Sequence, residues 1–130
     1  MVIVDSSVWI DLLRKSETPE TIAFERLAAD EEIGLGDLVL YEVLQGVTPA
    51  NMVEKVKSYM LTFDIFTMGG RDLALEAVHN AHIMRAQGIQ VAIIDCLIAT
   101  FCIVSGSRLL SSDRHFQPFV DILGLVMANV

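Results

Sequence analysis

Cysteine, basic side chains and long uncharged stretches are all scarce in this chain of 130 residues. The longest stretch without a charged residue, residues 96–107, has 12 residues, whereas a membrane-spanning helix needs about 20 apolar ones. The apolar run over residues 1–4 ends at Asp5, so no signal-peptide core is expected. We therefore expect a cytoplasmic protein that does not associate with a membrane.

The chain has only two cysteines, Cys96 and Cys102, in a segment whose pattern predicts one helix. Six positions apart, they would be separated by about 9 Å along the helix axis and would point to different faces. A disulfide needs Cα atoms within about 7 Å of each other, so this pair is not expected to form one. Two buried free thiols fit a reducing compartment.

The balance of charge is acidic, with 17 acidic side chains against nine basic ones and a formal net charge of −8. Proteins that bind nucleic acid usually carry a basic surface that attracts the phosphate groups. A function on nucleic acid would therefore require another source of phosphate attraction.

Short apolar segments alternate with longer amphipathic ones, without repeats or linkers, and the length suits one core. We expect a single domain over residues 1–130. Strands are predicted at residues 2–4, 33–36, 63–67 and 109–111, with a last edge strand at 123–127. Helices are predicted at about 6–13, 19–29, 38–44, 49–61, 71–87 and 94–104, with a helical turn over 114–119. This alternation predicts an α/β sandwich whose central, mostly parallel sheet has four to five short strands flanked by helices.

Four acidic residues stand out because they follow predicted strands or lie in apolar helices: Asp5, Glu42, Asp95 and Asp113. Asp5 directly follows the first predicted strand, and Asp113 follows the fourth after two residues. Asp95 is the only charge in residues 91–104, and Glu42 lies within a mostly apolar predicted helix. Functional groups of open parallel sheets gather beyond the carboxyl ends of the strands. We therefore expect the four acids to meet there.

Each acid also has a purely structural interpretation. Asp5, Asp95 and Asp113 could cap helices by accepting hydrogen bonds from free amides of the first turn, and Glu42 could belong to a half-exposed helical stripe. Gathered together, however, like charges 4 Å apart would repel by roughly 4 kcal/mol at an effective dielectric near 20. A divalent cation relieves that repulsion. Hard Mg²⁺ or Mn²⁺ suits carboxylates without cysteine or histidine better than zinc does.

The segments around these acids resemble the motifs of PIN-domain ribonucleases, especially the VapC toxins of bacterial VapBC toxin–antitoxin pairs. The first motif reads VIVDSSVWI and carries Asp5, and the second reads DLVLYEVLQG and carries Glu42. The third reads IDCLIA with Asp95, and the fourth reads LSSDRHF with Asp113. The resemblance covers nearly the whole chain in the family's order. Serine stands at Ser6 and Ser111, where the family more often has threonine.

The resemblance implies a PIN-like three-layer sandwich and a metal-dependent endoribonuclease that arrests growth by cleaving cellular RNA. The four acids would be the catalytic residues and would hold one or two Mg²⁺ or Mn²⁺ ions, which would also supply the phosphate attraction that the acidic chain lacks. Ser6 and Ser111 would hydrogen-bond these ligands, and we expect Arg114 to contact the RNA. The implied partners are a cognate VapB-type antitoxin and a second copy of the chain in a homodimer. DNA would be reached only through the antitoxin.

Two other classes of function are compatible with the residues themselves. A metal-dependent phosphohydrolase of small molecules could use the same α/β arrangement, although Ser7 stands where the haloacid-dehalogenase type has its second aspartate. A non-catalytic interaction module could keep the fold, but an unused cluster of carboxylates would only destabilise it. The stripe Glu76, His79 and His82 is expected to be a solvated helix face, and Trp9 is expected in the core.

Overall fold

The computed structural model describes all 130 residues and contains four β-strands, seven α-helices and two short 3₁₀ helices. The strands are β1 (Val2–Val4), β2 (Ile33–Gly36), β3 (Asp64–Phe66) and β4 (Arg108–Leu110). The α-helices are α1 (Ser6–Leu13), α2 (Pro19–Asp30), α3 (Asp37–Gln45), α4 (Val53–Met60), α5 (Arg71–Ala86), α6 (Ile93–Ser105) and α7 (Gln117–Leu123). The 3₁₀ helices are η1 (Ala50–Met52) and η2 (Arg114–Phe116). No helix combines the length and the apolar composition that a membrane span requires.

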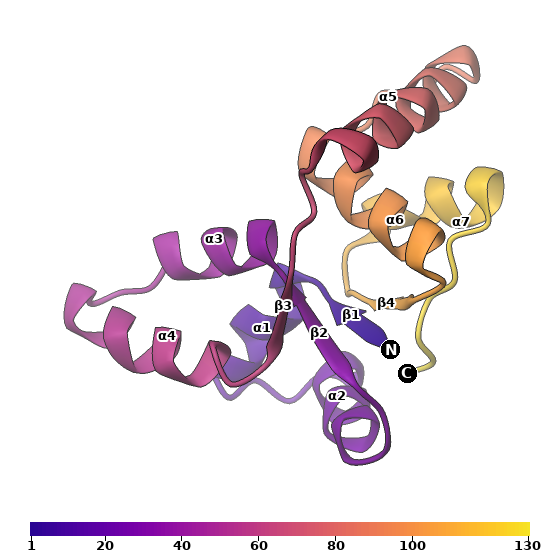
Figure 1. Cartoon of the computed structure of the whole chain (residues 1–130). Helices are drawn as coiled ribbons and strands as arrows, with labels where there is room; N and C mark the ends of the chain where they lie inside the picture. The colour runs from indigo at the N-terminus through magenta and orange to yellow at the C-terminus, as the bar shows by residue number, and fades with distance from the viewer.

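The strands form one sheet in the order β3-β2-β1-β4, and every neighbouring pair is parallel. Helices α1, α3 and α4 lie on one side of the sheet and α6 and α7 on the other, with α5 extending beyond α6 (Figure 1). This arrangement confirms the predicted PIN-like α/β sandwich. Because all four strands run in the same direction, their carboxyl ends share one edge of the sheet.

The central strand β1 positions the edge of the sheet where the acids lie. Its three residues are fully buried because β2 and β4 flank it and helices cover both faces. Trp9 is fully buried as well, as predicted, and its indole N–H donates to the carbonyl oxygen of Val4 at 3.0 Å. The Trp9 ring packs edge-on against Phe24 and Phe63, with centroids 5.4 and 5.0 Å away. These contacts hold the turn from β1 into α1, and with it Asp5, against the core.

The predicted edge strand at residues 123–127 is wrong. Helix α7 continues to Leu123 and ends at Gly124, whose φ of 77° lies in the left-handed region that glycine adopts without strain. Beyond it, a single parallel bridge joins Met127 to Leu109. Leu125 is nevertheless buried, so the apolar pattern reflects packing on the core rather than a ladder of hydrogen bonds. The sheet therefore has four strands.

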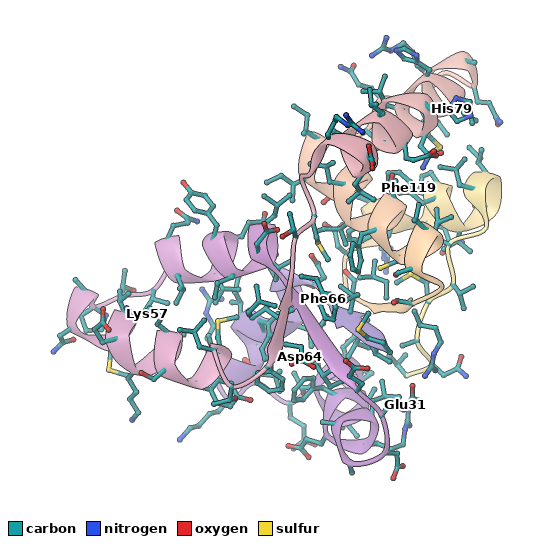
Figure 2. All side chains as sticks on the ribbon, in the orientation of Figure 1. Glu31, Lys57, Asp64, Phe66, His79 and Phe119 are labelled. Atoms are coloured by element: carbon teal, nitrogen blue, oxygen red, sulfur yellow. The ribbon has the colours of Figure 1, made fainter.

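The expectations about cysteine and histidine exposure are confirmed. Cys96 and Cys102 are both free and buried in α6, and burial raises the pKa of the Cys102 thiol to about 12. His79, labelled in Figure 2, lies exposed on α5, as Glu76 and His82 do.

Candidate active site

The four acids that the sequence singled out come from four segments that meet at the carboxyl edge of the sheet. Asp5 directly follows β1, and Asp113 follows the neighbouring strand β4. Glu42 lies in the second turn of α3, the helix that begins directly after β2. Asp95 is the third residue of α6. The parallel topology thus brings together residues that are far apart in the sequence.

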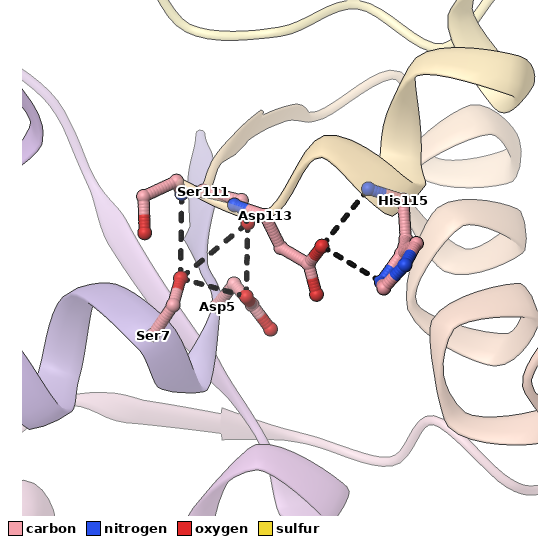
Figure 3. A network of polar contacts seen from close by, with 6 residues as sticks. Asp5, Ser7, Ser111, Asp113 and His115 are labelled. Atoms are coloured by element: carbon pink, nitrogen blue, oxygen red, sulfur yellow. Dashed lines mark hydrogen bonds and ion pairs between the residues drawn. The ribbon is translucent and has the colours of Figure 1, made fainter.

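Asp5 is the most deeply buried of the four, with 5 % of its surface exposed. Its Oδ2 accepts hydrogen bonds from the hydroxyls of Ser7 and Ser111, each at 2.9 Å (Figure 3). The Ser111 hydroxyl in turn accepts from the amide N–H of Asp113 at 3.0 Å, which links the end of β4 to the end of β1. The other oxygen, Oδ1, receives no hydrogen bond from the chain. No buried side-chain oxygen of the chain lacks a hydrogen-bond partner, so Oδ1 reaches solvent and is available for a ligand.

Both serines expected from the sequence lie against the acids, and a third one does as well. Ser111 donates to Asp5, and the hydroxyl of Ser6 lies against the Glu42 carboxylate, where it partly offsets the rise of that group's pKa. Sequence reasoning missed Ser7, whose hydroxyl donates to Asp5 and accepts from the amide N–H of Ser112 at 3.3 Å. Its place in the first turn of α1, two residues after Asp5, was the available signal.

The acids repel one another across a shared, partly desolvated space. Burial is the main cause that raises the pKa of Glu42, and the charges of Asp5 and Asp95 raise it further. Burial also raises the pKa of Asp95 most, followed by the charges of Asp113 and Asp5, while His115 acts in the opposite direction. Because burial and the neighbouring acids both disfavour the ionised form, the site resists carrying its full negative charge without a cation.

His115 belongs to the cluster, so the expectation of a site free of histidine is wrong. The Asp113 Oδ1 accepts from the His115 amide N–H at 2.9 Å and lies 3.0 Å from its ring Nδ1 (Figure 3). Asp95, Asp113 and His115 offer ligand atoms that lie within 4.8 Å of one another. The 3₁₀ turn η2 places the His115 ring against Asp113. No local sequence pattern predicts this contact.

The alternative that these acids are helix caps holds for one of them. Asp113 is the N-cap of η2 and accepts from the backbone of His115. Asp5 occupies the N-cap position of α1, but its side chain makes no cap hydrogen bond. Asp95 lies inside the first turn of α6, whose N-cap is Ala92. Capping therefore does not explain why Asp5 and Asp95 carry charge at this edge.

The donors at this site fit a hard divalent cation. They are mostly carboxylate oxygens, which Mg²⁺ and Mn²⁺ prefer, with one imidazole that Mn²⁺ also accepts. Asp5 uses Oδ2 for its hydrogen bonds to Ser7 and Ser111, so its solvent-accessible Oδ1 is free to bind such an ion. The site contains no thiolate, since both cysteines lie buried in α6.

Removing either serine hydroxyl that holds Asp5 is expected to weaken metal binding. We predict that Ser7→Ala and Ser111→Ala each reduce the affinity for Mn²⁺ by about 10- to 100-fold, because the Asp5 carboxylate loses a donor that orients it. Titration calorimetry of metal-free protein measures the effect. Ser58→Ala, an exposed serine on α4, is the matched control, and unchanged affinity in both site variants would contradict the prediction.

The chain matches a known protein family and is similar to solved structures of other proteins. Residues 2–119 match the PIN domain family. The ribonuclease VapC19 of Mycobacterium tuberculosis is 30 % identical over 129 residues, covering 94 % of this chain and 97 % of the relative. The solved structure of VapBC2 from Rickettsia felis, bound to a promoter DNA fragment, has a similar chain with a TM-score of 0.81 at 17 % identity, covering 100 % and 99 % of the two chains. The structure of VapC20 from M. tuberculosis, described as a Sarcin-Ricin loop cleaving toxin, gives 0.72 at 16 % identity with both chains fully covered.

Proposed function

The chain belongs to the PIN domain family, among its VapC ribonucleases, and from this we propose that it is a divalent-metal-dependent endoribonuclease. It would act as the toxin of a VapBC-type pair and arrest growth by hydrolysing cellular RNA. The observation that carries the proposal is the shared, partly desolvated space of four acids at the carboxyl edge of the sheet: Asp5, Glu42, Asp95 and Asp113. A phosphohydrolase of small molecules is not favoured by any observation on this chain.

The four acids would hold one or two Mg²⁺ or Mn²⁺ ions, with His115 at the edge of the same group. A bound divalent ion supplies Lewis-acid activation of water and neutralises charge at the phosphate. Ser7 and Ser111 fix the Asp5 carboxylate through Oδ2, which leaves Oδ1 for the ligand. Preorganised in this way, the site needs little rearrangement on binding.

Glu42 or Asp95 would accept a proton from the attacking water. Burial and neighbouring acids raise the pKa of both carboxyl groups, which makes each a stronger base than a solvated carboxylate. The hydroxyl of Ser6, which lies against the Glu42 carboxylate, would orient that group.

Arg114 is the residue that we assign to RNA binding. It directly follows Asp113, lies exposed and forms no ion pair within the chain. A free guanidinium beside the acids can bind a phosphate of the RNA with two parallel hydrogen bonds. Arg114 would thus supply a local positive charge for the RNA phosphate, although the chain as a whole is acidic.

The partners follow from the family. Solved relatives include a toxin–antitoxin complex from Klebsiella pneumoniae and VapBC-1 from Haemophilus influenzae, and we propose a VapB-type antitoxin for this chain, with DNA contacted only through it. We also propose a homodimer. Its support is the pair of exposed apolar side chains Leu75 and Val78, three positions apart on one face of α5, since exposed apolar patches mark association surfaces.

The direct test is cleavage of RNA by the purified protein. We expect single-stranded RNA to be cut internally in Mg²⁺ or Mn²⁺, cleavage to stop when EDTA removes the metal, and activity to return when metal is restored. Product analysis by denaturing gel electrophoresis measures the rate. Equal cleavage in EDTA would overturn the metal-dependent mechanism, and hydrolysis of phosphorylated metabolites without cleavage of RNA would support a phosphohydrolase instead.

A further inference from the structure

A hollow of about 330 Å³ lies directly beside the acid cluster, between the loop that joins α5 to α6 and the segment formed by η2 and α7. Its apolar wall includes Val91 from the loop and Pro118 and Phe119 from α7. Phe119, labelled in Figure 2, is 1 % exposed and packs against Phe116 with ring centroids 6.1 Å apart. The wall is therefore anchored in the core, and the hollow is a fixed part of the surface.

The rim of this hollow is polar and its side chains are available. Gln90 and Arg114 line it and are exposed, and neither side chain forms a hydrogen bond or an ion pair within the chain. The amide of a glutamine offers two donors and an acceptor, and the guanidinium of an arginine offers a flat cationic surface. A ligand here would thus meet an apolar wall on one side and unused polar groups at the edge.

The hollow is continuous with the candidate active site. Asp95 lines it and is one of the four acids, and His115 lines it while contacting Asp113. A group held in the hollow therefore lies next to the Asp95 carboxylate. One substrate could place one part in the hollow and the adjoining part at the acids. Because the Asp95 carboxylate lines it and Asp113 contacts His115 at its edge, the hollow does not suit a free inorganic anion.

The size and chemistry of the hollow match a nucleobase. A volume of about 330 Å³ is at the lower end of small-molecule sites, so it accommodates one base with its sugar rather than a folded RNA. Proteins that read single-stranded RNA take up unstacked bases against apolar, aromatic or guanidinium surfaces and hydrogen-bond their edges. Val91 and Pro118 offer the apolar surface, Arg114 the guanidinium, and Gln90 the hydrogen bonds.

We propose that this hollow binds the base of a nucleotide adjacent to the scissile phosphate of single-stranded RNA, and that Gln90 discriminates among bases at that position. This inference rests on the proposed ribonuclease function. Arg114 stacks on the bound base or holds its phosphate, and so positions the chain of the RNA across the acids.

Cleavage of a random RNA pool, read by sequencing the new ends, tests the role of Gln90. We expect the wild-type protein to favour one or two bases at one position beside the cut, and Gln90→Ala to reduce that preference about tenfold. Gln87→Ala is the matched control, because Gln87 is exposed at the end of α5 and lies outside the hollow. An unchanged preference in Gln90→Ala, even with slower overall cleavage, would overturn the inference.

A second measurement separates failure of this inference from failure of the proposed function. The four ribonucleosides, which carry no phosphate, are titrated into the ¹⁵N-labelled protein while the amide resonances of residues 89–92 and 114–119 are followed. We expect at least one nucleoside to shift both segments, and Gln90→Ala to reduce the shifts. Binding by a protein that cleaves no RNA would leave the hollow in place and reject the ribonuclease. Cleavage of RNA by a protein that binds no nucleoside in the hollow would support the ribonuclease and reject the hollow as a base-binding site.

Discussion

Expression of the wild-type chain in cells is expected to arrest growth and cleave RNA, and expression of Asp5→Ala or Asp95→Ala is expected to do neither. Both carboxylates belong to the cluster that would hold the metal. Losing a ligand removes several kcal/mol of transition-state stabilisation, which corresponds to a cleavage rate at least about 10³-fold lower. Growth curves and primer extension on total RNA measure the two effects.

The control for this experiment is an acid outside the cluster. Asp30 is exposed at the end of α2, and Asp30→Ala is expected to remain as toxic as the wild type. Equal toxicity of Asp5→Ala and Asp95→Ala, at matched protein levels, would rule out a mechanism based on carboxylates and metal. Loss of toxicity in Asp30→Ala would instead indicate that folding, rather than chemistry, is being measured.

Metal is expected to stabilise the wild-type fold strongly and the Asp95→Asn variant much less. At a concentration 100 times its Kd, a bound ion adds about 2.7 kcal/mol to the free energy of unfolding, which raises the Tm of a chain of this size by about 10 °C. In metal-free buffer, Asp95→Asn is expected to match or exceed the wild type, because the burial and repulsion that raise the pKa of Asp95 are relieved. Scanning calorimetry with EDTA and with Mn²⁺ measures all four conditions.

The same repulsion determines how the metal-free stability depends on pH. The pKa values of Glu42 and Asp95 are raised in the folded state, so the folded protein binds more protons than the unfolded chain. The free energy of unfolding should therefore fall as pH rises from the unfolded pKa values near 4 through the raised folded ones, and should level off above them. Mn²⁺ is expected to remove this part of the dependence, and Asp95→Asn to reduce it.

A large loss of stability in metal-free Asp95→Asn would argue for the structural interpretation of this acid. It would mean that the Asp95 carboxylate stabilises the first turn of α6 through its dipole, although the side chain makes no cap hydrogen bond there. Glu20→Gln, in the first turn of α2 and without an ion pair, shows how large such a dipole effect is without neighbouring acids.

The pattern of the sequence determined most of the fold because the relevant signals are local. The β-branched run at residues 2–4 predicts β1, and the helix that follows it begins where the serines allow it. The same holds for α5 and α6, whose bounds differ from the predicted ones by one residue at each end at most. The prediction of a strand at residues 123–127 failed because apolar spacing indicates which residues are buried. It does not indicate whether a neighbouring strand is free to pair.

For the candidate site, the sequence alone points to the four acids, through positions where a charge is unexpected and through motifs that match a family. The folded chain shows which atoms of these acids are available: Oδ2 of Asp5 is occupied by Ser7 and Ser111, and the ring of His115 lies against Asp113. Asp5 and Ser111 are 106 positions apart and meet only because β1 and β4 pair in parallel register. Contacts across that distance depend on how whole elements pack, which no local pattern of residues encodes.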